Sequence, residues 1–151
     1  MSVNDVAPIF LRNNIFQFNM SYSWNSVRSF PNKSFTTVRH RVLRAICRQD
    51  TDQLEKLIDE EGWPIDEIVD KQGKYTAFSL SCYLNHLECA HLCDLKGANI
   101  HKPVGKLGNT PLMNATINWN VNIVDYLIER GVDPLQTDIY GFTASRKAEL
   151  R

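Results

Sequence analysis

The chain has 151 residues and a formal net charge of zero, and its hydrophobic share of 43% and charged share of 23% are those of a soluble globular protein. This length accommodates one compact domain with an appendage, and no apolar run approaches the roughly 18 to 20 residues that a transmembrane helix requires. Residues 1–47 hold six bases and one acid, whereas residues 48–151 hold 11 bases and 16 acids, so the two parts carry +5 and −5. Because the bases are dispersed, we predict no nucleic-acid partner.

The first 36 residues form a compositionally distinct segment with six asparagines, six serines and five phenylalanines. Disordered tails are usually poor in aromatic residues, so we expect a docking arm that lies on a surface and contacts a partner through Phe16, Phe18 and Trp24. The segment is also rich in serine, poor in acids and contains spaced arginines, which is typical of mitochondrial targeting segments. We therefore predict a mitochondrial location, with a cytoplasmic one as the alternative.

Helical periodicity begins immediately after this segment. Ala45 and Ile46, followed by Leu54, Leu57 and Ile58, have the spacing of helices that bury one apolar stripe. The acids of this region are expected to form the solvated face of the second helix, and they are Asp50, Asp52, Glu55, Asp59, Glu60 and Glu61.

The rest of the chain repeats itself. Thr76 and Thr110 lie 34 residues apart, as do Gly97 and Gly131, and the blocks between them are alike. Thr110 followed by Pro111 predicts a helix start, since threonine caps free N–H groups and proline needs no donor at the first helical position. The two glycines follow apolar helical runs and predict helix ends with positive φ.

This pattern resembles the ankyrin repeat. The residues that match it best in one copy are Gly108, Thr110, Pro111, Leu112, Ala115, Ile123, Val124, Leu127, Ile128, Gly131 and Asp133. The preceding copy matches through Thr76, Phe78, Cys82, His86, Glu88, Gly97 and Ala98, and a partial copy opens at Asp138, Gly141 and Thr143. The resemblance implies an all-α solenoid over residues 37–151, with about three repeats, a C-terminal repeat holding only its first helix, and β-turn fingers near residues 66–72, 100–107 and 134–140.

The resemblance also implies a function. Ankyrin arrays bind other proteins, so we expect a non-catalytic module without a cofactor, working as an accessory subunit of a larger, hetero-oligomeric and mitochondrial complex. A free cytosolic adaptor is the alternative within this class.

Large apolar residues at positions that the family normally leaves exposed indicate where a partner would bind. These are Leu80, Tyr83 and Leu84 in one repeat and Ile117 and Trp119 in the next, where Trp119 replaces the usual glycine. We expect them to form one patch on the concave side. The alternatives are that the N-terminal arm covers them or that they are half buried.

Two functions of other classes stay open. Cys82, Cys89 and Cys93 lie near His86 at helical spacing, which would suit a zinc or redox site. The repeat pattern places these cysteines at apolar positions instead, and without a secretory signal we expect reduced thiols that pack as small hydrophobic residues. Peripheral membrane contact through the basic arm is the second alternative.

Overall fold

A computed structural model describes residues 38–150, which belong to one compact unit. Within this range the helices are α3 (Val38–Cys47), α4 (Thr51–Asp59), α5 (Ala77–Leu84), α6 (Leu87–Leu95), α7 (Pro111–Ile117), α8 (Val121–Glu129) and α9 (Ala144–Glu149). Extended structure in the described residues is limited to two isolated antiparallel bridges, which join Ile68 to Thr76 and Val104 to Asn109. The predicted all-α class is confirmed.

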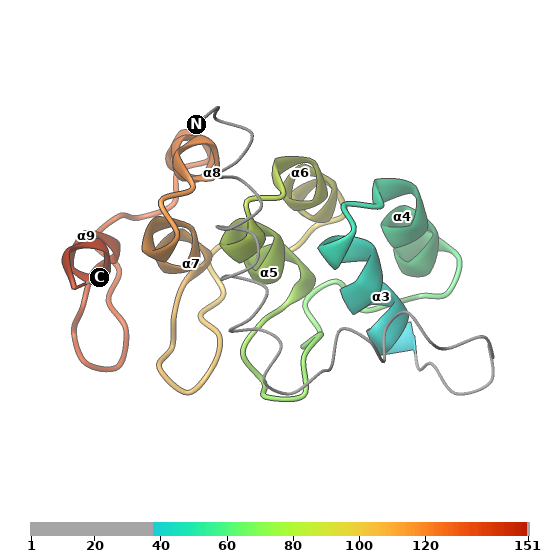
Figure 1. Cartoon of the computed structure of the whole chain (residues 1–151), viewed down its shortest axis with the longest axis horizontal. Coiled ribbons are helices and arrows are strands. Elements are labelled where there is room, and N and C mark those ends of the chain that lie inside the picture. Colours follow the sequence, from blue (N-terminus) through green and yellow to red (C-terminus); the bar gives the residue numbers. More distant parts are fainter. Residues whose placement is uncertain (1–37, 151) are drawn as a thin grey trace, which may run out of the picture. The chain divides into compact units, whose positions relative to one another are not determined.

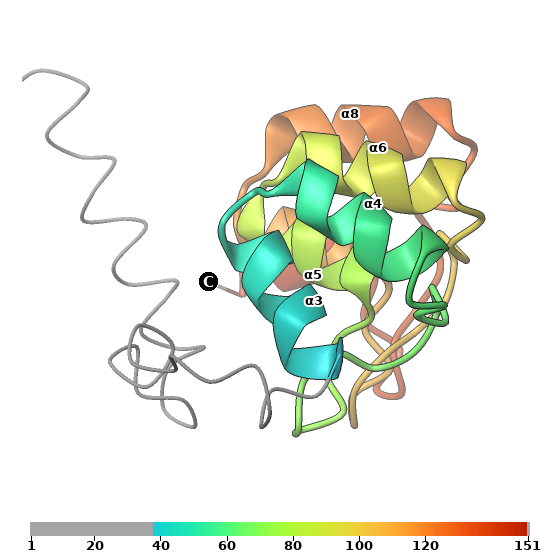
Figure 2. The same cartoon turned by 90° about the vertical axis from the view of Figure 1, so that its right-hand side faces the viewer.

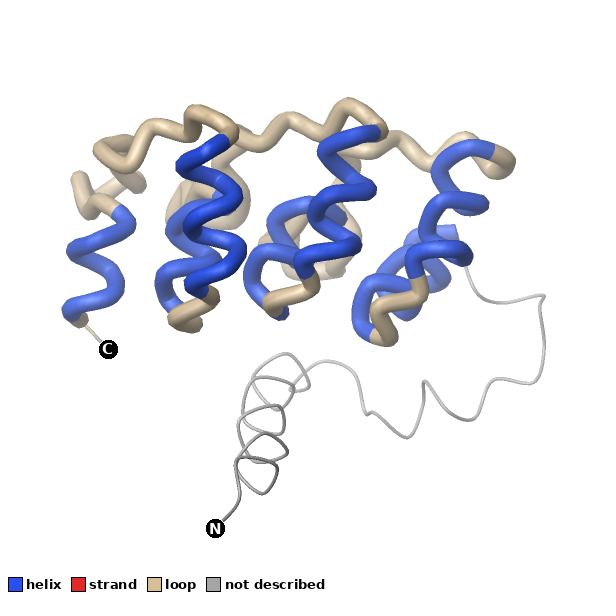
Figure 3. The backbone as a smooth tube through the Cα atoms, turned by 90° about the horizontal axis from the view of Figure 1, so that it is seen from above, coloured by secondary structure: helices blue, strands red, loops and turns tan. Residues whose placement is uncertain are grey.

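The helices form a row of antiparallel pairs. Figure 1 shows α3 with α4, α5 with α6 and α7 with α8 standing side by side, with α9 beside α7. The first helices of the pairs make one layer and α4, α6 and α8 make the other, and Figure 3 shows the same row from above. Because α5 packs against α3 on one side and α7 on the other, the helix pairs bury one another's apolar sides.

The first helices α5, α7 and α9 each begin at a threonine that caps them. The side chains of Thr76, Thr110 and Thr143 accept hydrogen bonds from the third backbone N–H of α5, α7 and α9, at 3.2, 3.3 and 3.3 Å. Pro111 occupies the first turn of α7, as predicted. A cap of this kind contributes about 1 kcal/mol, and Thr76 and Thr110 are buried, so their caps also satisfy donors that water cannot reach.

The second helices end where the sequence predicts. Gly97 and Gly131 follow the last turns of α6 and α8 with φ of +87° and +79°. Their N–H groups donate to Asp94 and Ile128 carbonyls at 2.9 Å. An L-residue with a side chain rarely adopts this φ, so glycine lets the chain turn here at little cost.

The core repeats with the same period as the sequence. Leu57, Cys93 and Leu127 occupy the same position of α4, α6 and α8, and all three are fully buried. Phe78 and Leu112 likewise share one position of α5 and α7 and are buried. The stripe predicted for the first repeat is buried at Ala45, Ile46, Leu54 and Leu57 and half buried at Ile58. In the second repeat a cysteine takes the place of Leu57.

Three loops, called fingers here, connect the helix pairs and project beyond the layer of first helices (Figure 2). In the first finger, Asp70 is buried and its carboxylate accepts hydrogen bonds from the backbone N–H groups of Gln72, Lys74 and Tyr75. Asp138 repeats this arrangement in the third finger with the N–H groups of Tyr140 and Phe142, both at 2.9 Å. The predicted fingers are confirmed, and a carboxylate organises two of them.

The last helix is fixed by a buried ion pair. Lys147 of α9 lies 2.7 Å from the Asp138 carboxylate and donates to the Asn109 side chain at 2.6 Å. Burial alone would raise the pKa of Asp138, but the Lys147 ammonium and the backbone donors outweigh it and lower that pKa below its usual value. The single helix of the partial repeat thus joins the second and third fingers.

The described helices are too short or too polar for any of them to cross a bilayer. The predicted extension of residues 1–36, with Phe16, Phe18 and Trp24, lies outside the described residues. Its separation from the repeats and its role in docking stay predictions.

Candidate interaction surface

The turns between paired helices are held by polar side chains from the next repeat. Nδ1 of His86, at the start of α6, lies 2.8 Å from the carbonyl oxygen of Ile46 at the end of α3. A carbonyl only accepts, so Nδ1 carries the proton. One repeat later, Asn120 donates to the carbonyl of Cys82 at 2.8 Å. Both bonds reach carbonyls at the end of a helix, where intrahelical donors run out, and the Ile46 carbonyl also accepts from the Gln49 N–H at 3.0 Å.

Burial lowers the pKa of His86, although its bond to Ile46 partly opposes this. The imidazole is therefore neutral near neutral pH. The sequence match to the family's histidine located this residue but did not reveal its partner, because Ile46 lies 40 residues away.

Trp119 occupies the turn between α7 and α8 in a strained conformation. Its φ is +57°, and its side chain is 67% exposed. The neighbouring Asn118 and Asn120 hold the turn in place by donating to the carbonyl of Tyr83 at 2.8 and 3.0 Å. A bulky residue in this region costs about 1 to 2 kcal/mol. Trp119 recovers little of that cost by burial.

The preceding turn has the same backbone with a different residue. Asn85 stands 34 positions before Trp119 and has a φ of +62°. Asparagine tolerates this conformation because its short side chain bonds locally. The turn therefore does not require tryptophan, and folding does not explain why the third repeat has one.

The predicted contiguous patch is not found, because two of its five residues are buried. Leu80 is fully enclosed and Tyr83 is 8% exposed, with its ring 5.3 Å from that of Tyr75. The reason is that α5 has first helices on both sides, so the position that seemed open is covered by its neighbours. Leu84 and Ile117 are half buried. Of the five residues, Trp119 alone is exposed.

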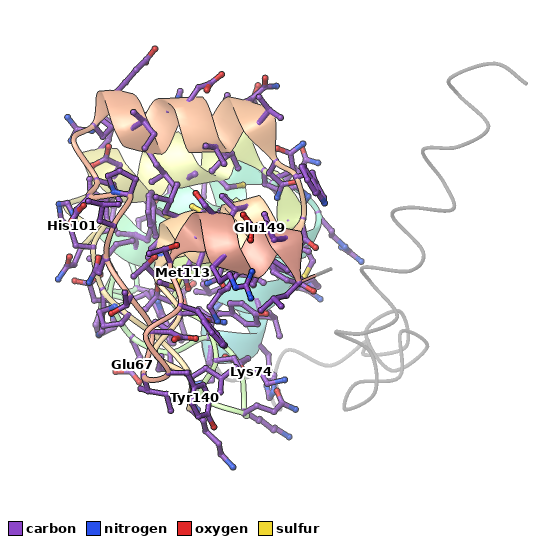
Figure 4. All side chains as sticks on the ribbon, turned by 90° about the vertical axis from the view of Figure 1, so that its left-hand side faces the viewer. Glu67, Lys74, His101, Met113, Tyr140 and Glu149 are labelled. Carbon is purple, nitrogen blue, oxygen red and sulfur yellow. The ribbon has the colours of Figure 1, made fainter. Side chains whose placement is uncertain are left out.

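An apolar surface on the fingers was not foreseen. Its residues, called the finger surface here, are Leu107, Ile139, Tyr140 and Phe142, all at least 37% exposed, and the rings of Tyr140 and Phe142 lie 6.5 Å apart. The second and third fingers are joined by a 3.0 Å bond from the Ile139 N–H to the Leu107 carbonyl, and Figure 4 shows Tyr140 at the outer end of its finger. Apolar residues in loops that are usually polar were the available signal.

The outer faces of the second helices carry a ladder of ion pairs. Lys96, just after α6, lies 2.9 Å from Glu55 and 2.5 Å from Asp59 of α4. Arg130, at the same position after α8, donates to both oxygens of Asp94 at 2.7 and 3.0 Å. The Arg130 guanidinium holds the pKa of Asp94 below its usual value against the effect of partial burial.

A small hollow lies beside this ladder between α6 and α8, lined by His91, Asp94, Leu95, Tyr126 and Arg130. The hydroxyl of Tyr126 donates to Asp94, and its ring lies 4.3 Å from that of His91. The Tyr126 hydroxyl and the Arg130 guanidinium both bond the Asp94 carboxylate, and the His91 ring contacts the Tyr126 ring, so we assign the hollow a role in holding the second and third repeats together.

The helix cysteines are part of the core. Cys82, Cys89 and Cys93 are fully buried, as packing predicts. Burial raises the pKa of Cys89 to about 11 and that of Cys93 to about 12, and it also raises the pKa of Cys82. A higher pKa means less of the reactive thiolate. In the part of the chain that the structure describes, no three histidine, cysteine or acidic side chains are grouped as metal ligands.

Comparison with known proteins agrees with this architecture. A family model for ankyrin repeats in three copies matches residues 42–138, which is more than half of the chain. No curated protein matches the chain.

Proposed function

The chain belongs to the ankyrin-repeat family, and we propose that it is a non-catalytic subunit that holds a partner protein through Trp119. Repeats of this family are protein–protein interaction modules, and the finer assignment rests on one observation. An exposed tryptophan stands where the backbone disfavours it and where the preceding repeat folds with asparagine.

Tryptophan is a favoured anchor in protein interfaces because it supplies a large contact area and loses little conformational freedom. Leu84 and Ile117, which are half buried near the ends of α5 and α7, would extend the contact. The finger surface offers a second place of contact. Two weak contacts on one chain strengthen each other through effective concentration, as expected for a subunit that stays bound.

The complex that we propose is mitochondrial, and this part rests on composition alone. Residues 1–36 are poor in acids, rich in serine and spaced with arginines, as targeting segments are. Cell fractionation of the full chain tests it. Recovery in the cytosolic fraction alone would instead support a free adaptor.

The binding proposal is tested by affinity purification of the full chain at native abundance, read by quantitative mass spectrometry. Trp119→Gly is compared with Asn85→Gly, which makes the same change one repeat earlier. We expect the first variant to lose a co-purifying protein by at least about tenfold, or about 1.4 kcal/mol, and the second to retain it. If both variants retain the same proteins at wild-type levels, the assignment of Trp119 is wrong.

A parallel variant, Ile139→Asp with Tyr140→Ala, tests the finger surface in the same experiment. If a partner is lost from this variant and retained by Trp119→Gly, the partner binds the finger surface and not Trp119.

A further inference from the structure

In the described part of the chain, the row of second helices ends at α4 on one side and at α8 on the other (Figure 1). Lys96 of the second repeat pairs with Glu55 and Asp59 of α4, and Arg130 of the third repeat pairs with Asp94 of α6. Among the described residues, no helix stands beyond α8 on the side away from α6 (Figure 1). Figure 4 looks onto this side, with α8 and α9 nearest the viewer.

Four residues of α8, called the α8 edge here, share this side. Val121, Asp125, Ile128 and Glu129 are separated by four, seven and eight residues, which places them on one face of a helix. All four are exposed, Val121 by 61% and Ile128 by 46%. In the covered repeats, Leu87 of α6 and Ile58 of α4 stand at the positions of Val121 and Ile128 and are only half exposed. A following helix therefore partly covers the Val121 and Ile128 positions elsewhere in the array, whereas His91 and Leu95, at the positions of Asp125 and Glu129 in α6, stay exposed.

The α8 edge carries two acids at the same helix positions as the two acids of α4 that pair with Lys96. Glu55 and Asp59 lie five and nine residues after Asp50, the residue that caps α4. Asp125 and Glu129 lie five and nine residues after Asn120, which stands at the same position before α8. The α4 pair holds Lys96 at 2.9 and 2.5 Å. Within residues 38–150, no cation pairs with Asp125 or Glu129.

We propose that the α8 edge binds a helix of a partner protein that carries an apolar stripe and a lysine or arginine just after its last turn. This inference rests on the proposed function, that the array binds protein, and adds a second surface with a defined chemistry. The partner helix would lie on α8 as α6 lies on α4, with its cation between Asp125 and Glu129.

A second copy of this chain does not fit that description. The helix that a second copy would offer is α4, at the other end of the row. The residue just after α4, at the position of Lys96 and Arg130, is Glu60, which is exposed. An acid there would face the two carboxylates of the α8 edge, and like charges at close range oppose binding.

The probe is a synthetic, helix-stabilised peptide with the sequence of residues 120–131, which carries an apolar stripe and Arg130 just after its last turn. Its binding to the full chain is measured by titration calorimetry at low and high salt. We expect saturable binding in the micromolar range that weakens as salt rises. The charge-reversed protein Asp125→Lys with Glu129→Lys should bind at least about tenfold more weakly.

Two matched controls make the result specific. Asp52→Lys with Glu60→Lys reverses two exposed acids, one in α4 and one just after it, and should leave binding unchanged. A peptide with Arg130→Glu should bind the wild-type chain poorly and recover binding to the charge-reversed chain. Thermal unfolding of each variant checks its fold. We expect no loss of stability, because the four acids are exposed.

Absence of binding up to about 1 mM peptide, or equal loss in both charge-reversed proteins, would overturn the proposal. Binding that appears only after residues 1–36 are deleted would identify the chain's own N-terminal segment as the occupant and would also overturn it. Neither result would alter partner retention that depends on Trp119, so this inference and the proposed function fail separately.

Discussion

The second and third repeats have nearly the same backbone and different side chains at three informative positions. Both begin at a buried threonine cap and end at a glycine with positive φ. Corresponding residues of the two repeats lie 34 positions apart. Between these points, Leu80 corresponds to Asn114, Asn85 to Trp119, and His86 to Asn120. The shared residues are those that a helix pair needs in order to form and stack. The differing residues show which side chain the surroundings of each repeat accept, so exchanging them separates folding from function.

The largest effect is expected when the second repeat receives the buried residue of the third. Leu80→Asn removes a fully enclosed leucine from α5 and places an amide among its neighbours. Lost packing and an unsatisfied polar group together should lower the free energy of unfolding by about 4 kcal/mol, measured by urea denaturation. A loss below about 1 kcal/mol would show that the site opens to water and that the two positions are interchangeable.

The reverse exchange should stabilise the protein. Asn114 is 2% exposed, and its side-chain N–H₂ group has no hydrogen-bond partner. Asn114→Leu removes this cost and is expected to raise the free energy of unfolding by about 1 to 2 kcal/mol. The same denaturation experiment measures it, with the exposed change Asn122→Leu on α8 as the control. If Asn114→Leu instead lowers the free energy of unfolding, the Asn114 amide has a hydrogen-bond partner in solution.

The third exchange removes a pH dependence. The folded-state pKa of His86 is lowered by burial, so its contribution to stability is complete above the unfolded value of about 6.5 and falls as the pH drops below it. His86→Asn keeps the type of bond that Asn120 makes to the preceding helix. We expect nearly equal stability at pH 7 and a smaller loss than wild type between pH 6.5 and 5.

His40, whose pKa is also lowered, remains in both proteins, so their difference reports on His86. Parallel stability curves for wild type and His86→Asn over this range would contradict the neutral, bonded imidazole.

The smallest effect concerns the turn. Trp119→Gly relieves a φ of +57° and should raise the free energy of unfolding by about 0.5 to 1 kcal/mol, measured by thermal unfolding. Asn85→Gly should change it by less, since asparagine already suits this conformation. If Trp119→Gly destabilises the protein by more than about 1 kcal/mol, the tryptophan has a structural role and folding explains its presence.

The repeat period, the caps and the helix ends were predictable because each depends on residues close together in the chain. Thr110 with Pro111 determines a local geometry wherever it occurs, and so does a glycine after an apolar helix. The burial of Leu80 and Tyr83 was not predictable, since it depends on how closely α3 and α7 approach α5. The same holds for the bond from His86 to Ile46 and for the ladder through Lys96 and Arg130, which join residues more than 30 positions apart.

Within the candidate surface, the exposure of Trp119 was predictable because the family has a glycine there, where a side chain has nothing to pack against. The α8 edge required the structure, because its meaning comes from comparison with the contacts that α4 makes.

The most direct test of the central claim is to place a photoreactive benzoylphenylalanine at position 119 of the full chain in cells. This aromatic residue keeps the bulk of tryptophan at the turn. The same residue at position 52, an exposed site on α4, is the control. We predict one dominant cross-linked protein from position 119 and none of that identity from position 52. An absence of adducts at position 119, or the same adducts from both positions, would contradict the claim that Trp119 anchors a partner.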